Sequence, residues 1–287
     1  MPHHNKTKDV SSAEITAIYR SSLPHISGDF LSAQLIQEPG RTRAAAFIEK
    51  YNYPLVQRKI ALSSSFCRQQ ANRLLATGLY DSVISFASGF SLLTYYIKKD
   101  NPKLTNIVYY DTDLENMASE RMNRLHLLRD SVDMDALNSI QIKPFNIEKA
   151  YSDGKSLKES FPECRNPIFI CDGVVYFLTE GCTRWLIDQA GDYQHSALVL
   201  YYWHTQMHAQ SQLFSKVFND LNQGMILETL THLWDQEMLD HIKKHFSVIQ
   251  DWTLADYERS LHETKGIAIE LTDMKTYFPI QLLCCEK

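Results

Sequence analysis

Short β-rich runs alternate with helical stretches through most of the chain that follows Gly78. Strands separated by helical connections pair in parallel, because each connecting helix carries the chain back across the face of the sheet. The alternation therefore predicts an α/β fold with five parallel strands. These strands are expected at Val83–Phe86, Asn106–Tyr110, Ser139–Phe145, Ile168–Cys171 and Ala197–Tyr202. Helices between them are expected at Leu114–Arg129, Gly154–Phe161 and Thr179–Gln189.

Both ends of the chain depart from this alternation. The first 78 residues show helical periodicity that Pro54 is expected to interrupt, and no linker of Ser and Gly marks a domain boundary. We expect residues 1–78 to form a helical cap on an α/β domain of residues 79–287. Near the C-terminus, Phe246–Trp252 and Phe278–Cys285 are expected to add an antiparallel pair at the sheet edge. The predicted fold is a Rossmann-like, seven-stranded, mostly parallel sheet with a helical N-terminal cap.

The charge and the apolar pattern exclude several kinds of partner. A formal net charge of −5 over 287 residues gives no basic surface for nucleic acid or an anionic membrane. Residues 1–10 lack the apolar stretch of a secretory signal, and no window approaches the ~20 apolar residues of a membrane span. The six cysteines are scattered without a CxxC pair, which favours reduced thiols. We therefore expect a cytoplasmic protein that acts on a small molecule, and the sequence leaves its oligomeric state open.

Small and acidic residues follow the first two expected strands. Ligands of doubly wound sheets bind at the carboxyl ends of the strands, and the small side chains of Ala87 to Ser91 let a ligand approach the backbone there. After the second strand, Asp111 and Asp113 offer carboxylates that accept both hydroxyls of a ribose. The turn has one glycine, Gly89, where a dinucleotide fingerprint needs three, and the chain has no GxxxxGKS/T phosphate loop. A nucleoside without phosphates, such as S-adenosylmethionine, fits better than NAD or ATP.

The third and fourth expected strands also end in candidate binding residues. Asn146 and Ile147 follow the third strand, where an amide beside an apolar group can read the edge of an adenine. Asp172 follows the fourth strand and precedes an aromatic segment that ends at Leu178. The ends of the first four strands thus predict one ligand site along the rim of the sheet.

Four segments at these strand ends resemble, in order, motifs of the leucine carboxyl methyltransferase family. They are Val83 to Ser91, Tyr110 to Asp113, Phe145 to Ile147 and Asp172 to Leu178, and Thr16 to Arg20 resembles the family's N-terminal helix. The resemblance spans most of residues 14–190, and four ordered motifs are far more specific than one. It implies a class I methyltransferase fold that binds S-adenosylmethionine. Members include protein-phosphatase carboxyl methyltransferases and bacterial O-methyltransferases of natural-product pathways.

The resemblance also implies which residues hold the cofactor. It assigns the methionine part to Ala87 and Gly89, its amino group to Asp172, the ribose to Asp113, and the adenine to Asn146 and Ile147.

Five positions depart from the family pattern. Ala87 stands at the family's first glycine, Ser91 at the Asp after its turn, Asn146 at its adenine Asp and Asp172 at its Glu. Ser63 stands where the family carries an arginine that holds the cofactor carboxylate. An arginine fork on a carboxylate is a strong charge-assisted contact, so we expect either that Arg58 or Arg68 supplies it or that the aminobutyrate arm of the cofactor is held differently.

Tyr176 is the best candidate for an aromatic contact with the cofactor. Aromatic faces stabilise a cation such as a sulfonium by about 0.5–2 kcal/mol per contact. Several aromatic residues cluster near the expected mouth of the sheet, although any one of them is more often part of the core. Tyr176 is the exception that we expect to line the site, because it follows closely on Asp172.

Two histidine pairs have the i, i+4 spacing that places side chains on one helix face, namely His204/His208 and His241/His245. Neither pair belongs to an HExxH motif, so solvated or hydrogen-bonded histidines are the simpler interpretation, and no metal site is predicted. His204, beside Trp203, is a candidate general base.

The favoured function is an O-methyltransferase of secondary metabolism that acts on a small-molecule carboxylate or hydroxyl. Tyr176, Asp172 and His204 are the candidate catalytic residues, and catalysis is expected to be mostly proximity and desolvation. One alternative is a cyclase that converts S-adenosylmethionine to azetidine-2-carboxylate and methylthioadenosine, with Asp172 or Asn146 orienting the amine and Tyr176 shielding the sulfonium. The missing arginine at Ser63 and the expected aromatic cage motivate it. A second alternative is a catalytically silent protein that binds the cofactor or a partner.

Overall fold

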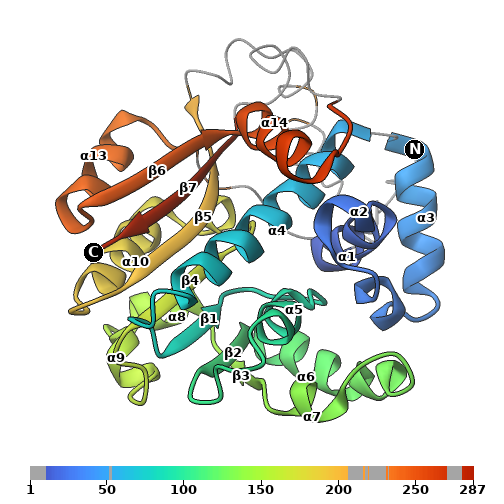
Figure 1. The fold of residues 1–287 in the computed structure, drawn as a ribbon, viewed down its shortest axis with the longest axis horizontal. Helices are drawn as coiled ribbons and strands as arrows, with labels where there is room; N and C mark the ends of the chain where they lie inside the picture. Colours follow the sequence, from blue (N-terminus) through green and yellow to red (C-terminus); the bar gives the residue numbers. More distant parts are fainter. Residues whose placement is uncertain are drawn as a thin grey trace, which may run out of the picture.

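A seven-stranded sheet forms the centre of the protein (Figure 1). The computed structural model describes residues 11–51, 54–205, 216, 219, 231, 233–269 and 280–287. The strand order is β3-β2-β1-β4-β5-β7-β6; the first five pair in parallel, and β7 runs antiparallel to both β5 and β6. The strands are β1 Ser82–Ser85, β2 Val108–Asp113, β3 Gln141–Pro144, β4 Pro167–Cys171, β5 Ala197–Trp203, β6 Val248–Thr253 and β7 Ile280–Glu286. The seven strands, the mostly parallel sheet and the antiparallel edge pair predicted from the sequence are confirmed.

Burial along the strands follows their place in the sheet. The central strands β1, β4 and β5 are buried at every residue, because helices cover both faces of a parallel sheet. The edge strands β3 and β6 carry intermediate and exposed residues instead. In register, Ser85 at the end of β1 lies beside Asp111 of β2 and Ile170 of β4. The carboxyl ends of these three strands therefore meet at one rim.

The N-terminal helices form a small core of their own. They are α1 Ser12–Ser22, α2 Pro24–Ser27, the 3-10 helix η1 Ser32–Leu35 and α3 Gly40–Tyr51. A capping box starts α1: the Ser11 hydroxyl accepts from the backbone N–H of Glu14, and the Glu14 carboxylate accepts from that of Ser11. Ile15 and Tyr19 pack with Ala44 and with Ile60 of the next helix. This packing fixes α1 against its neighbours.

Helix α4, Pro54–Leu75, follows the expected interruption of the helical periodicity. Helix α3 ends at Tyr51 and α4 begins at this proline, so Pro54 separates two helices as predicted. A proline in the first turn lacks only an N–H that has no partner within the helix. The helix runs in front of the sheet in Figure 1 and packs on α1, α2, α5, α14 and the strands β4, β5 and β7. It thus joins the N-terminal helices to the core of the sheet.

The remaining helices connect the strands. They are α5 Leu93–Asp100, α6 Glu115–Arg124 with the 3-10 turn Leu125–Leu128, α7 Met134–Asn138, α8 Ile147–Ser152, α9 Leu157–Ser160, the 3-10 turn η3 Val175–Phe177, α10 Glu180–Gly191, α13 Gln236–His245 and α14 Leu254–Lys265. Helix α6 is shorter than expected, and α7, α8 and α13 lie outside the expected helices. Among the described residues, none of the helices combines the length and the apolarity that crossing a membrane requires.

Candidate active site

The turn after β1 is pinned to the end of β2. The backbone N–H of Ser88 donates to the carbonyl of Thr112 at 2.9 Å, and that of Gly89 donates to Asp113 Oδ2 at 2.6 Å. Gly89 has a φ of 51°, and a Cβ added there would lie 2.9 Å from Ala13 of α1. Ala87 has a φ of 48°, a conformation that glycine adopts without strain. Both residues have a positive φ, so the turn keeps the backbone conformation that favours glycine although residue 87 is alanine.

Asp113 and Asp111, both predicted to hold a ribose, lie in different surroundings. Asp113 is half-buried at the rim, where its carboxylate also accepts from the backbone N–H of Leu114 at 2.8 Å. Asp111 is 1% exposed, forms an ion pair with Arg121 and accepts from the hydroxyl of Thr94 at 2.6 Å. The structure therefore puts Asp113 at the rim and Asp111 in the core beneath it.

Arg121 contacts the turn after β1 from the buried side, a role that no sequence pattern indicated. Its guanidinium, on α6, is 2% exposed and donates to both Asp111 and the carbonyl of Gly89, the latter at 2.9 Å. One side chain thus links the strand that carries Asp113 to the turn that contains Gly89.

Asp172, after β4, joins two N-terminal helices. Arg20 of α1 lies 3.0 Å from its Oδ2, and the hydroxyl of Ser63 on α4 donates to its Oδ1 at 3.2 Å. All three side chains are buried. Ser63, at the position where the family that the sequence resembles carries an arginine, therefore lies next to Arg20 from another helix, and both contact the Asp172 carboxylate.

Neither arginine expected to replace the missing one lies beside Asp172. Arg58 forms a buried ion pair with Glu258 of α14 and donates to the carbonyl of Ala268. Arg68 pairs with Asp100 at 2.6 Å and donates to the carbonyl of Gly28. The structure does not bring these two side chains to the other predicted site residues, and it brings Arg20 there instead.

A buried lysine occupies the cluster of aromatic residues that was expected to form a cage. Lys59 of α4 is 4% exposed, and its Nζ donates to Tyr201 Oη at 2.7 Å and lies 3.9 Å from the centre of that ring. The rings of Tyr176 and Trp203 stack at 4.7 Å, and their centres lie 5.7 and 5.8 Å from the same Nζ. A Cβ on Gly173 would meet Tyr201 Oη at 2.5 Å, so the Asp172 turn abuts this cluster.

Burial changes the protonation of this cluster. It lowers the pKa of Lys59 to about 7; the positive charge of Arg20 acts in the same direction, and Asp172 opposes both. Burial raises the pKa of Tyr201 well above its ordinary value, and the neighbouring Tyr176 and Asp172 add to this. Near neutral pH, Lys59 is therefore partly an uncharged amine, whereas the Tyr201 phenol keeps its proton. Sequence analysis missed Lys59; its only local signal is its place directly before the apolar residues Ile60 to Leu62.

The other predicted site residues are spread along the rim and across the sheet. Asn146 caps α8 by accepting from the backbone N–H of Lys149 at 3.0 Å, and Ile147 is buried. The N–H of Phe145 donates to the carbonyl of Asp113, so this segment lies beside the rim. His204 lies toward Tyr202, with ring centres 6.3 Å apart, on the face opposite Tyr201. The structure thus separates His204 from Tyr176, while its predicted partner His208 lies outside the described residues.

Comparison with known proteins supports the fold alone. No protein-family profile matches the sequence, and no curated protein sequence matches it. The chain is similar to the solved structure of a proposed methyltransferase from Thermobifida fusca YX, with a TM-score of 0.63 and 10% identity over 98% of this chain and 96% of that one. For an O-methyltransferase family protein from Burkholderia thailandensis the TM-score is 0.48, with 11% identity over 95% of this chain and 71% of that one. The first similarity shows that the sheet and its helices have the Rossmann-like α/β fold expected from the sequence.

Proposed function

We propose that this protein transfers the methyl group of S-adenosylmethionine to a hydroxyl of a small molecule. The observation that carries the proposal is the buried amine of Lys59, 2.7 Å from Tyr201 Oη and next to the turn that follows β4. Ligands of this class of sheet bind at such strand ends. A buried lysine whose pKa is near 7 suits the removal of a proton from a hydroxyl.

The residues at the rim fit the parts of this cofactor. Gly89 lets the turn pack closely on Ala13 of α1, and the Asp113 carboxylate suits the two ribose hydroxyls. Asp172 would face the amino group of the methionine part. Arg20 would hold its carboxylate, since the guanidinium is buried and its Nε has no hydrogen-bond partner among the described residues. Arg20 would thus supply the positive charge that the family resembled by this sequence carries at the position of Ser63.

The reaction needs the protein chiefly to position the acceptor and to take up one proton. When bound, the cofactor supplies an activated methyl group and its own leaving group. The acceptor oxygen forms its bond to the methyl carbon as the carbon–sulfur bond breaks, with the electron pair staying on sulfur. Lys59 accepts the hydroxyl proton, and Tyr201 fixes the position of the amine. Trp203 and Tyr176 keep water from this amine, which maintains its low pKa.

The cyclase alternative loses both observations that motivated it. Arg20 lies beside Ser63, so the cofactor carboxylate does not lack a buried cation. The amine of Lys59 lies among Tyr176, Tyr201 and Trp203, so a side chain already occupies the cage that was expected to shield the sulfonium. Methyl transfer is the reaction that these contacts favour.

Product analysis tests the proposal. The protein is incubated with S-adenosylmethionine alone and then with sets of small alcohols, phenols and carboxylic acids, and products are identified by mass spectrometry. We expect S-adenosylhomocysteine to form only when a hydroxyl acceptor is present. Methylthioadenosine formed from the cofactor alone would establish the cyclase instead, and binding without any turnover would establish a silent binding protein.

The substitution Asp113→Asn is expected to weaken cofactor binding by about 10–100-fold, because hydrogen bonds to a charged group contribute about 1.5–3 kcal/mol. Isothermal titration with S-adenosylhomocysteine measures this change. Glu115→Ala, an exposed site two residues on, removes the same charge and serves as the matched control. Equal affinities for the two variants would remove Asp113 from the proposed ribose site.

A further inference from the structure

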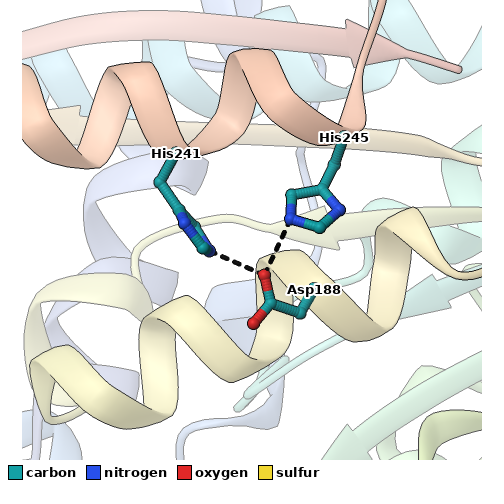
Figure 2. A group of neighbouring side chains, drawn as sticks. All are labelled: Asp188, His241 and His245. Atoms are coloured by element: carbon teal, nitrogen blue, oxygen red, sulfur yellow. Dashed lines mark ion pairs between the residues drawn. The ribbon is translucent and has the colours of Figure 1, made fainter.

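Three potential metal ligands converge between α10 and α13, and none of them belongs to the proposed active site (Figure 2). Asp188 belongs to α10, and His241 and His245 lie one turn apart on α13. Asp188 Oδ1 lies 2.7 Å from His241 Nε2 and 2.9 Å from His245 Nε2. Both imidazoles therefore point the same type of nitrogen at one carboxylate oxygen.

The two contacts have the distances of ion pairs but not the geometry of ordinary hydrogen bonds. Asp188 Oδ1 and His241 Nε2 are buried atoms, and neither makes a hydrogen bond of ordinary geometry with a described residue. One ligand atom from each of the three residues lies within 4.8 Å of the others. Ligand atoms of a tetrahedral zinc ion lie about 3.3 Å apart, given bonds of about 2.0–2.1 Å. The two measured oxygen–nitrogen distances are shorter than this, so the rotatable Asp188 side chain would have to move away from the imidazoles by about half an ångström when such an ion binds.

The packing of the two helices holds the imidazoles in place. A Cβ added to Gly191, the last residue of α10, would lie 2.7 Å from both Cβ and Nδ1 of His245. Met238 and Ile242, on the same helix as the histidines, are buried, which fixes the rotation of α13. The Asp188 side chain is 45% exposed, so water can reach the remaining coordination position. The cluster thus has two rigid ligands, one adjustable ligand and an open side.

We propose that Asp188, His241 and His245 bind one divalent transition-metal ion, with Zn²⁺ as the matching ion. Two imidazole nitrogens and a carboxylate oxygen are a ligand set that zinc accepts, with water as a fourth ligand. Mg²⁺ prefers a set made of oxygen ligands and is not expected to bind. The ion links α10 to α13, the helix that leads directly into the edge strand β6. The site is independent of methyl transfer.

Titration of the metal-free full-length protein with Zn²⁺ tests this site. We expect one ion per chain, with a dissociation constant in the micromolar range or tighter. At about a hundredfold excess over this constant, Tm should rise by about 4–8 °C, and Mg²⁺ should produce no shift. His241→Ala and Asp188→Asn should each weaken binding by more than about a hundredfold, since even changes outside the ligands themselves cost about 10–100-fold.

Two controls separate this site from other histidines. His126→Ala changes an exposed histidine in the turn after α6 and should leave zinc binding intact. The double variant His3→Ala/His4→Ala removes the adjacent histidines near the N-terminus and should do the same. The proposal is overturned if this double variant abolishes binding, if Asp188→Asn and His241→Ala bind zinc as tightly as the unaltered chain, or if the unaltered chain fails to bind zinc.

Discussion

Replacing Arg121 by methionine is expected to lower the free energy of unfolding by about 3–5 kcal/mol, the cost of leaving one buried charge without its partner. Asp111 is 1% exposed, and in the variant the Thr94 hydroxyl would be its remaining side-chain donor among the contacts described above. The carbonyl of Gly89 loses a donor as well. Urea denaturation at pH 7 measures the change.

Arg129→Met is the matched control for this prediction. The Arg129 side chain is 75% exposed and lies 3.7 Å from Asp130, so its loss should cost less than about 1 kcal/mol. The double variant Arg121→Met/Asp111→Asn should recover part of the loss, because it also removes the buried negative charge. If Arg121→Met destabilises no more than Arg129→Met, the buried pair does not hold the turn.

The substitution Lys59→Met is expected to reduce methyl transfer to a hydroxyl acceptor by about 10²–10⁴-fold, the usual contribution of a positioned base. In the unaltered enzyme, the rate should rise with pH through about 7 as Lys59 loses its proton. In the variant this step should be absent, and a carboxylate acceptor, which has no proton to lose, should be affected far less. Methyl-transfer rates of both proteins are measured from pH 6 to 9; a variant whose pH–rate profile matches that of the unaltered protein would rule out Lys59 as the base.

The same variant has a second readout that does not depend on catalysis. Because burial lowers the pKa of Lys59 in the folded protein, the unfolded chain binds more protons between about pH 7 and its unfolded value of about 10.4. Stability should therefore rise with pH in this window, by up to about 1.4 kcal/mol per unit. Lys59→Met should lose this slope, whereas Lys103→Met, at an exposed site, should keep it.

The strands and their order of appearance were predictable because their signals are local. Each β-rich run lies between helical runs, and the observed strands begin within about two or three residues of the expected positions. The proximity of Gly89 and Asp113 was predictable for a related reason, since neighbouring parallel strands end at the same rim. The interruption at Pro54 was predictable as well, because a proline disrupts the interior of a helix but suits the first turn of the next one.

The charged residues of the site were not predictable in the same way. Arg20, Lys59 and Arg121 come from three helices, and their partners lie more than 30 residues away in sequence for all contacts except that between Arg121 and Asp111. A lysine or arginine on a helix is usually solvated, so nothing local marks these three as buried. Their roles depend on how the helices pack on the sheet. Because nothing local marks Lys59 as buried, the sequence predicted that a ligand would fill the cage of Tyr176 and its neighbours, where the structure has Lys59 instead.

Helix α1 has a consequence for the catalytic cycle. Its 11 residues include Ala13, which covers the Gly89 turn, and Arg20, which holds Asp172. In the proposed site, a spent nucleoside would lie against both places and would leave only after this segment undocks. Undocking of α1, rather than bond formation, would then limit the rate of turnover, and the strength of the Arg20–Asp172 ion pair would govern how long the product stays bound.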